Sequence, residues 1–188
     1  SRAAKAFPKD SEIAYNLGVA LKQGGKLPRA ATEFERATTL NPRHADAWNN
    51  LGSTLSDLND IPKSAAAFAR AIDIQPNNPM FLENAGGAEE GLGRPRAARQ
   101  YFERALAAGG DRGRLLTCIA ATWMDNQEGD NDKALEYLHA ALAAAPDNIA
   151  AMALIGYVEE RRHNLKAAEK AVAQGLAIAD DDPLLNCV

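Results

Sequence analysis

The apolar residues of the chain recur at helical spacing in paired blocks, and residues 45–78 show one pair clearly. In the first block the apolar residues share one helical face: Trp48, Leu51 and Leu55. In the second block they again share one face: Ala65, Phe68, Ala71 and Ile72. Asn59 and Asp60 form a turn signal between the blocks, and Pro76 ends the second block. The pattern predicts two helices joined by a tight turn, a unit that cannot bury its apolar faces alone.

Copies of this pair follow at a period of 34 residues. Four residue types keep the period: glycine (Gly18, Gly52, Gly86), phenylalanine (Phe34, Phe68, Phe102), alanine (Ala37, Ala71, Ala105) and proline (Pro8, Pro42, Pro76). Because glycine has no Cβ, we expect a neighbouring helix backbone to approach closely at these positions. We expect the phenylalanines to fill the space between successive units. These recurring positions are therefore interpreted as structural.

The period divides the chain into five repeats at residues 11–44, 45–78, 79–112, 113–148 and 149–182, with partial repeats at 1–10 and 183–188. The fourth repeat is two residues longer, which we assign to the turn at residues 126–132. Ala120 replaces the repeated glycine there, and Leu138 replaces the phenylalanine. Ala3 and Pro8 match the end of an earlier repeat, and the chain lacks an initiator methionine. We therefore expect it to be part of a longer protein.

The Trp-x2-Leu-Gly pattern followed by Ala, Phe, Ala and Pro resembles the tetratricopeptide repeat family over nearly the whole chain. The resemblance implies an all-α fold, an α-solenoid of antiparallel helix-turn-helix repeats wound into a right-handed superhelix, as a single domain over residues 1–188. It also implies a scaffold or adaptor that binds an extended segment of a partner protein in a concave groove. In this family the first helix of each repeat lines that groove.

The resemblance places the residue two positions before each repeated glycine in the groove, and three of these are asparagines: Asn16, Asn50 and Asn84. Asparagine has poor helix propensity, so three in register indicate a function. Their amides can hydrogen-bond the backbone of a bound peptide. The row resembles the asparagine ladder of O-linked N-acetylglucosamine transferase and kinesin light chains. The alternative is that each amide bonds a neighbouring helix or water and only sets the repeat geometry.

Other candidate peptide-binding residues flank this row or line the later repeats. Tyr15, Asn49 and Glu83 precede the three asparagines directly. In repeats four and five the asparagine positions hold Cys118 and Leu154, so the groove becomes more apolar there. The residues expected to line that half are Thr117, Ala121, Met124, Ala153 and Tyr157. A core role for Met124 is an equal alternative.

Three further functions were weighed from the sequence. A carboxylate clamp for acidic chaperone tails needs basic residues where Glu12, Met80 and Asn84 stand, so it is not favoured. An accessory, substrate-recruiting region of a larger enzyme such as a glycosyltransferase remains an alternative. Self-assembly is the third, because Leu184 and Leu185 begin a helix without a following partner. Exposed solenoid ends of this kind predict a homo-oligomer.

The composition of the chain limits the classes of partner that it is expected to bind. The net charge of −4 does not favour nucleic acid, and no run of about 18 apolar residues predicts a membrane span. Cys118 and Cys187 are the only cysteines, without zinc spacing or a disulfide framework. Two free thiols favour a reducing compartment, and we expect a cytoplasmic protein.

No catalytic pattern is present in the sequence, so we expect neither an enzyme nor a cofactor. His44, His139 and His163 lie on different repeats without a second ligand at metal-binding spacing. The turn from Asp125 to Glu136 loosely resembles a calcium loop. It lacks the glycine at the sixth position and is interpreted as a solvated acidic turn.

Overall fold

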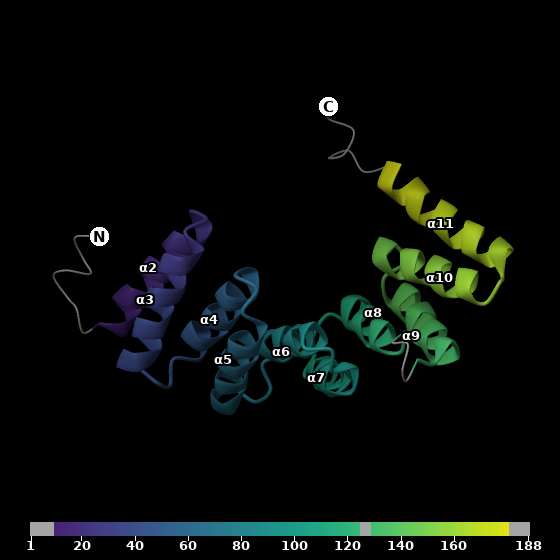
Figure 1. The fold of residues 1–188 in the computed structure, drawn as a ribbon. Coiled ribbons are helices and arrows are strands. Elements are labelled where there is room, and N and C mark those ends of the chain that lie inside the picture. Colours follow the sequence, from purple (N-terminus) through teal and green to yellow (C-terminus); the bar gives the residue numbers. More distant parts are fainter. Residues whose placement is uncertain (1–9, 125–128, 181–188) are drawn as a thin grey trace. The chain divides into compact units, whose positions relative to one another are not determined.

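The computed structural model describes residues 10–124 and 129–180, and within these ranges all regular structure is helical (Figure 1). The helices are α2 (Ser11–Gln23), α3 (Leu27–Leu40), α4 (Ala45–Asp57), α5 (Ile61–Ile74), α6 (Pro79–Gly91), α7 (Pro95–Ala107), α8 (Arg112–Thr122), α9 (Asn131–Ala144), α10 (Ile149–Arg161) and α11 (Leu165–Asp180). Consecutive helices pack in pairs, which confirms the predicted all-α solenoid of helix-turn-helix repeats.

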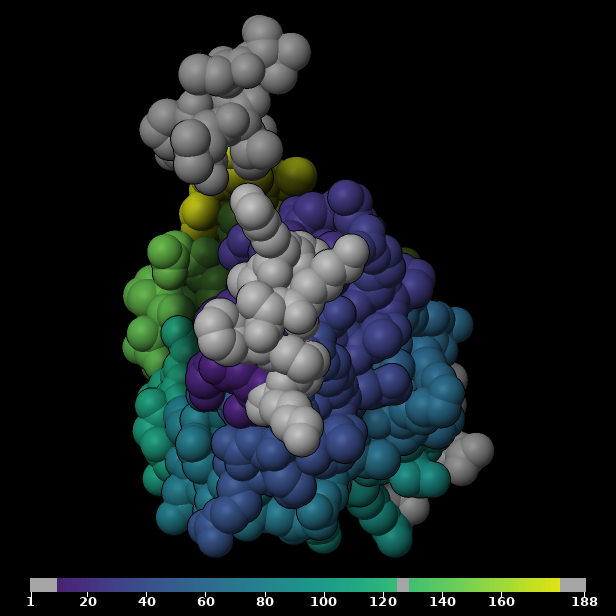
Figure 2. Space-filling view, turned by 90° about the vertical axis from the view of Figure 1, so that its left-hand side faces the viewer, coloured from purple at the N-terminus to yellow at the C-terminus, as the bar shows by residue number. Residues whose placement is uncertain are grey.

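The contacts divide the chain into two compact units, residues 1–97 and 98–188, and each is described by itself. In unit 1, α2 packs on α3 and α4 on α5, while α3 also contacts α4 and α5 contacts α6. In unit 2, α8 packs on α9, α9 on α10 and α10 on α11. In the space-filling view of Figure 2, the helices of unit 1 from α2 onward form a closely packed surface in purple and blue.

The turns of four hairpins, α2–α3, α4–α5, α6–α7 and α10–α11, each contain one residue in the left-handed conformation. Gly25, Asn59 and Gly93 have φ values of 69°, 62° and 68°, and they stand one repeat apart. His163 takes the same role between α10 and α11 with a φ of 59°. Asparagine adopts this conformation more readily than most residues with a side chain, which explains why Asn59 can replace glycine. The turn is therefore conserved in geometry between repeats even where its residue changes.

The repeated glycine makes room for a side chain of its own hairpin. A Cβ added at Gly18 would lie 2.7 Å from the ring of Phe34, and one at Gly52 would lie 2.7 Å from the ring of Phe68. The expected close neighbour was a helix backbone, so this part of the sequence interpretation is corrected. The ring of Phe34 is completely buried and shares a core with Leu21, Leu51 and Leu55. It thus fills space within its hairpin and toward the next one.

Repeat four uses a different pair of residues for the same contact. Ala120 and Leu138 are both completely buried in the core of unit 2. Leucine is smaller than phenylalanine, which leaves space for the alanine methyl group. In repeat five, by contrast, a Cβ at Gly156 would lie 2.7 Å from Val172. The smaller valine of repeat five therefore leaves no more space at its glycine than phenylalanine does in repeats one and two, and the exchange to Ala120 and Leu138 is specific to repeat four.

Trp123 is the C-cap residue of α8. Its ring lies between two cations, with Cζ of Arg99 3.3 Å and Nζ of Lys133 4.2 Å from the ring centroid. Arg99 also donates hydrogen bonds to the hydroxyl and the carbonyl oxygen of Thr122, at 2.9 and 3.0 Å. These contacts join three helices of unit 2 at the start of the longer turn.

Several sequence predictions fall outside the described residues. They concern the partial repeats containing Ala3, Pro8, Leu184 and Leu185, the thiol of Cys187, and most of the longer turn, including Asp125.

We expect Gly52→Ala to lower the free energy of unfolding by about 1–2 kcal/mol, because the added methyl group would overlap the buried Phe68 ring. Gly87→Ala is the matched control, since a Cβ there meets nothing within 4 Å. This control should stabilise α6 by up to about 1 kcal/mol through helix propensity. Chemical denaturation of both variants measures the difference.

Testing Gly52→Ala in a second variant, Phe68→Leu, separates the overlap with the Phe68 ring from other effects of the added methyl group. Phe68→Leu imitates the Ala120–Leu138 pair of repeat four. In this background Gly52→Ala should cost little, so the two substitutions should show strong coupling in a double-mutant cycle. Equal costs of Gly52→Ala with phenylalanine and with leucine at position 68 would contradict the proposed contact.

Candidate functional site

The first helices of unit 1 lie close to one another. α2 contacts α4, and α4 contacts α6. On the opposite side, α3 and α5 are separated by a hollow of about 560 Å³ whose floor includes Trp48, Leu51 and Leu55 of α4. Successive hairpins therefore converge at their first helices and diverge at their second helices. This geometry places the first helices on the inner side of the bend between hairpins.

Side chains at helical spacing form one row along each of these helices. On α4 the row consists of Asp46, Asn50, Ser53 and Asp57. Glu12 and Asn16 begin the corresponding row on α2, and Met80 and Asn84 begin that on α6. We call these eight residues, together with Tyr15 and Glu83, the first-helix face. It contains all three asparagines of the predicted row.

Asn50 connects two helices and keeps one polar atom available. Its Nδ2 donates hydrogen bonds to the hydroxyl of Tyr15 at 3.2 Å and to the carbonyl oxygen of Asp46 at 3.0 Å. Because that carbonyl can only accept, the amide nitrogen must face it. Both N–H groups of the Asn50 amide are therefore used within the protein. Its Oδ1 remains as an acceptor on the partly exposed side chain.

Asn84 makes an equivalent connection one repeat later, whereas Asn16 has no such connection among residues 10–124 and 129–180. Nδ2 of Asn84 donates to Oδ1 of Asn49 at 2.9 Å. Asn49 itself is only 6% exposed, so it serves as an internal acceptor between α4 and α6. The side chain of Asn16 is exposed. The donor atoms of Asn50 and Asn84 thus bond neighbouring groups of the protein, as the structural alternative predicted. Their amide oxygens and the side chain of Asn16 are the groups to which the peptide-binding hypothesis applies.

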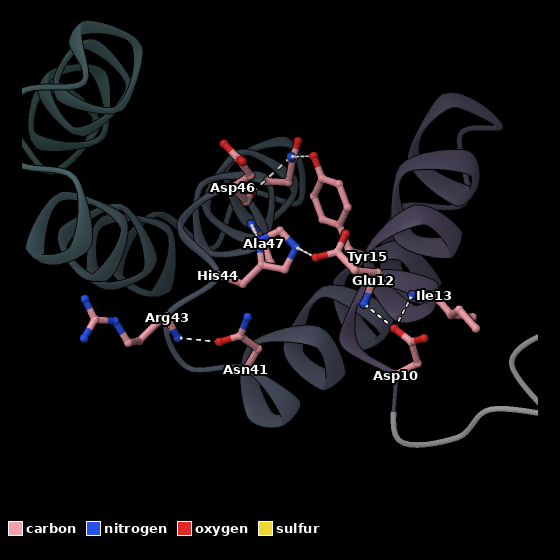
Figure 3. A network of polar contacts seen from close by, with 10 residues as sticks. Asp10, Glu12, Ile13, Tyr15, Asn41, Arg43, His44, Asp46 and Ala47 are labelled. Carbon is pink, nitrogen blue, oxygen red and sulfur yellow. Dashed lines mark hydrogen bonds and ion pairs between the residues drawn. The ribbon is translucent and has the colours of Figure 1, made fainter.

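The network around α2 and α4 is shown in Figure 3, where Tyr15 points from α2 toward α4. His44 caps α4 by accepting the backbone N–H of Ala47 at Nδ1, at 3.3 Å. Its Nε2 lies 3.3 Å from Oε1 of Glu12. This nitrogen has no hydrogen-bond partner among the described residues.

The charge state of Tyr15 reflects its surroundings. Burial raises the pKa of its phenol above the ordinary value, and the negative charge of Asp46 adds to this effect. The hydrogen bond from Asn50 opposes the increase, while Glu12 contributes to it. The neutral phenol is thus favoured beside two carboxylates.

Lys22 adds a connection that the sequence interpretation missed. Its Nζ lies 2.6 Å from the hydroxyl of Ser53 and 3.1 Å from Oδ2 of Asp57. A separation of 35 residues joins Lys22 to Asp57, Tyr15 to Asn50 and Asn49 to Asn84. Polar pairs separated by one period plus one residue are therefore the signal that would have identified these contacts.

The 35-residue separation between polar partners also occurs in unit 2, with other residues. Nδ2 of Asn148 donates to the carbonyl oxygen of Gly113, 35 residues earlier, and to the hydroxyl of Thr117, at 3.2 and 3.0 Å. Thr117 is 8% exposed and thus has a structural contact. Met124 and Leu154 pack against the core of unit 2. The predicted apolar lining of this half therefore contains several core-facing residues.

Tyr157 is more exposed than these core-facing residues. It is 50% exposed and borders a hollow of about 570 Å³ on the surface of α10 and α11. Leu165, Val172 and Leu176 line the same hollow and are 61%, 46% and 59% exposed. We call these four residues the α10–α11 face.

Two absences within the described residues bear on the chemistry of the chain. Among residues 10–124 and 129–180, no three His, Cys, Asp or Glu side chains are grouped so as to hold a metal ion. In the same ranges no helix combines the length and apolarity that crossing a bilayer requires.

Sequence comparison now places the chain in a family. Two family profiles, both described as tetratricopeptide repeat, match it, one at residues 1–36 and 15–79 and the other at residues 126–186. The chain belongs to the tetratricopeptide repeat family. Proteins of this family are protein-interaction scaffolds. A comparison with curated protein sequences found no match.

Solved structures of other tetratricopeptide repeat proteins share the fold. YrrB, described as having an unusual peptide-binding site, has a TM-score of 0.76 and 19% identity, covering 98% of this chain and 94% of its own. MamA from Desulfovibrio magneticus RS-1 has a TM-score of 0.82 and 15% identity, with 92% and 97% covered. PilW, a type IV pilus biogenesis factor, has a TM-score of 0.80 and 22% identity, with 90% and 78% covered. At these identities the similarity concerns the fold alone.

We expect Tyr15→Phe to change how stability depends on pH. A phenol whose pKa is raised on folding stabilises the protein below the ordinary value of 10.0 and loses that contribution as pH rises through the folded value. Wild-type stability should therefore fall above about pH 10 by more than that of the variant. Denaturation between pH 8 and 11 measures this, and parallel curves would contradict the assignment.

Proposed function

We propose that the chain is a scaffold whose first-helix face in unit 1 binds an extended segment of a partner protein. The observation that carries the proposal is the register of Asn16, Asn50 and Asn84 on three consecutive first helices. Asn50 has both N–H groups engaged internally, so its amide offers an acceptor to a ligand. Backbone N–H groups of a peptide are the matching donors.

The spacing of the helices suits an extended ligand. Packed helices lie about 8–10 Å apart. A polyproline II segment rises about 3.1 Å per residue and has three residues per turn, so it presents the same side about every 9 Å. One backbone N–H per turn can then meet one asparagine oxygen per repeat. This match supports recognition of backbone with little dependence on side chains.

The remaining candidate residues take different roles in this proposal. Tyr15 and Glu83 flank the asparagines and border the bound segment. Asn49 and Thr117 are buried, and we assign them to the contacts between repeats. The proposal includes no catalytic step and no cofactor. The cysteine content of the sequence leads us to expect this binding in the cytoplasm.

The test begins with peptides of 12 residues selected on the chain from a random library. Asn16→Ala and Asn84→Ala should each weaken a selected peptide about 2- to 13-fold, the value of one net hydrogen bond. Asn16→Ala is the cleaner variant, because its side chain is exposed. Isothermal titration calorimetry gives the affinities, and circular dichroism checks folding.

Tyr15→Phe is the matched control for Asn50→Ala. It removes the hydroxyl that accepts from Asn50 while keeping the amide oxygen. Asn50→Ala should weaken binding more than Tyr15→Phe does. If both weaken it equally, the effect comes from the contact between α2 and α4. If selected peptides bind all asparagine variants as they bind the wild type, the proposed site is wrong.

The α10–α11 face favours a second candidate function, association between copies of the chain. Phe68 and Ile72 occupy the corresponding positions in repeat two and are 3% and 8% exposed, since α6 packs there. Val172 and Leu176 are 46% and 59% exposed, and among the described helices only α10 packs on α11. Apolar surface of this kind favours pairing with an equivalent surface. We propose that a second copy covers this face.

We expect Leu176→Glu to reduce association of the chain, because a charge would enter the apolar contact. Gln174→Glu is the control, since it adds the same charge to an exposed position of α11 outside the hollow. Sedimentation velocity from about 1 to 100 µM should show a concentration-dependent mass for the wild type and the control. A monomer at every concentration would exclude this candidate.

A further inference from the structure

Charge is distributed unequally between the two layers of helices in unit 1. The first helices α2, α4 and α6 contain six acidic residues (Glu12, Asp46, Asp57, Glu83, Glu89, Glu90) and one basic residue, Lys22. The second helices α3 and α5 contain three acidic residues (Glu33, Glu35, Asp73) and four basic residues (Arg29, Arg36, Lys63, Arg70). The negative charge is therefore concentrated on the helices that carry the proposed binding site.

The single cation of these helices does not neutralise the row of carboxylates at their N-terminal ends. Lys22 is held by Asp57 at 3.1 Å, near the C-terminal end of α4. Glu12 and Asp46 lie at the other end, each four residues before an asparagine, and correspond to each other on successive helices. The side chain of Glu12 is 65% exposed, and Asp46 is exposed. Both carboxylates can reach a ligand that contacts Asn16 and Asn50.

The hydrogen-bonding groups of the first-helix face also favour a cationic ligand. Asn50 uses its donors internally and offers only an acceptor, and carboxylates accept without donating. Lysine and arginine side chains donate without accepting. A cationic side chain therefore satisfies both the charge and the hydrogen-bonding needs of this face. An acidic side chain would satisfy neither.

The third helix continues this row with a different chemistry. Met80 occupies on α6 the position that Glu12 occupies on α2 and Asp46 on α4, and it is 50% exposed. Methionine is flexible and apolar, and it packs well against varied apolar side chains. Across three repeats the row is thus acidic, acidic and apolar.

We propose that the partner segment is basic, with two Lys or Arg side chains over Glu12 and Asp46 and an apolar side chain over Met80. This inference rests on the proposed function, since it assigns the chemistry of the segment that the asparagines bind. With helices about 8–10 Å apart and about 3.1 Å per residue, consecutive contacts fall about three residues apart. The segment therefore has the form basic-x-x-basic-x-x-apolar, or the reverse order.

Peptides selected from the random 12-residue library test the composition directly. Enrichment of Lys or Arg pairs three residues apart is expected, together with affinity that falls as salt is raised. Synthetic peptides with Lys-x-x-Arg-x-x-Leu in both orders should bind more tightly than the same peptides with Glu at the basic positions. Fluorescence anisotropy at 50 and 300 mM NaCl measures both effects.

The variant Glu12→Gln/Asp46→Asn removes the two charges and keeps similar side-chain shapes. It should weaken the basic peptides about 2- to 30-fold, the value of two exposed ion pairs, and flatten their salt dependence. The control Glu35→Gln/Asp73→Asn removes the same charge from exposed positions on second helices. This control should leave both the affinity and its salt dependence nearly unchanged.

The outcomes separate the two proposals. Neutral or acidic peptides whose binding depends on Asn16 and Asn84 would overturn the basic-segment inference and leave the proposed function standing. Equal losses in the two charge variants would also overturn it, because net charge alone would then explain the effect. If no selected peptide depends on the asparagines, the proposed function fails, whatever the charge of the peptides.

Discussion

The contact between a repeated glycine and a side chain of its partner helix sets how closely the two helices of a hairpin pack. At Gly18 and Gly52 the absence of a Cβ allows an aromatic ring to lie against the helix. The buried rings then extend toward the next hairpin and contribute to its core. The stacking of repeats thus depends on a contact within each repeat. In repeat four, Ala120 and Leu138 take the places of this glycine and phenylalanine, and both are buried in the core of unit 2.

A second set of contacts fixes each first helix against the following one. Polar side chains 35 residues apart join α2 to α4 and α4 to α6 on the first-helix face. These bonds occupy some of the donors that a ligand would otherwise use. In the proposed function, structural and binding roles are divided between the atoms of a single amide. With such a division, asparagines of poor helix propensity would serve stability and recognition together.

The chain sequence predicted the fold well because its period repeats residue types whose packing roles are simple. Glycine indicates a close contact, phenylalanine a core position and proline a helix boundary. Each can be recognised without knowing which residues lie nearby in the fold. The sequence did not reveal that Asn59 and His163 adopt the left-handed conformation, since neither is glycine. It also missed that Trp123 ends its helix between two cations. These features depend on side chains that meet only after the hairpins have packed.

For the candidate site, the sequence indicates which helices carry the asparagines but does not indicate their hydrogen-bond partners. The register of the asparagines follows from the period, so the helices that carry them could be identified. Which amide atoms face a neighbour depends on the 35-residue step between helices, a tertiary distance that the sequence pattern alone does not specify. The buried state of Asn49 and Thr117 has the same origin.

The hydrogen bonds that hold Asn50 have a consequence for the kinetics of recognition. Two bonds, to Tyr15 and to the carbonyl of Asp46, fix the rotamer of this side chain before any partner arrives. A freely rotating side chain loses conformational entropy when a complex forms, at a cost of roughly 0.5–1.5 kcal/mol. For Asn50 that loss has already occurred during folding. At the proposed site, the acceptor would therefore already have one orientation in the free protein, and an encounter with a partner segment would need no search among its rotamers.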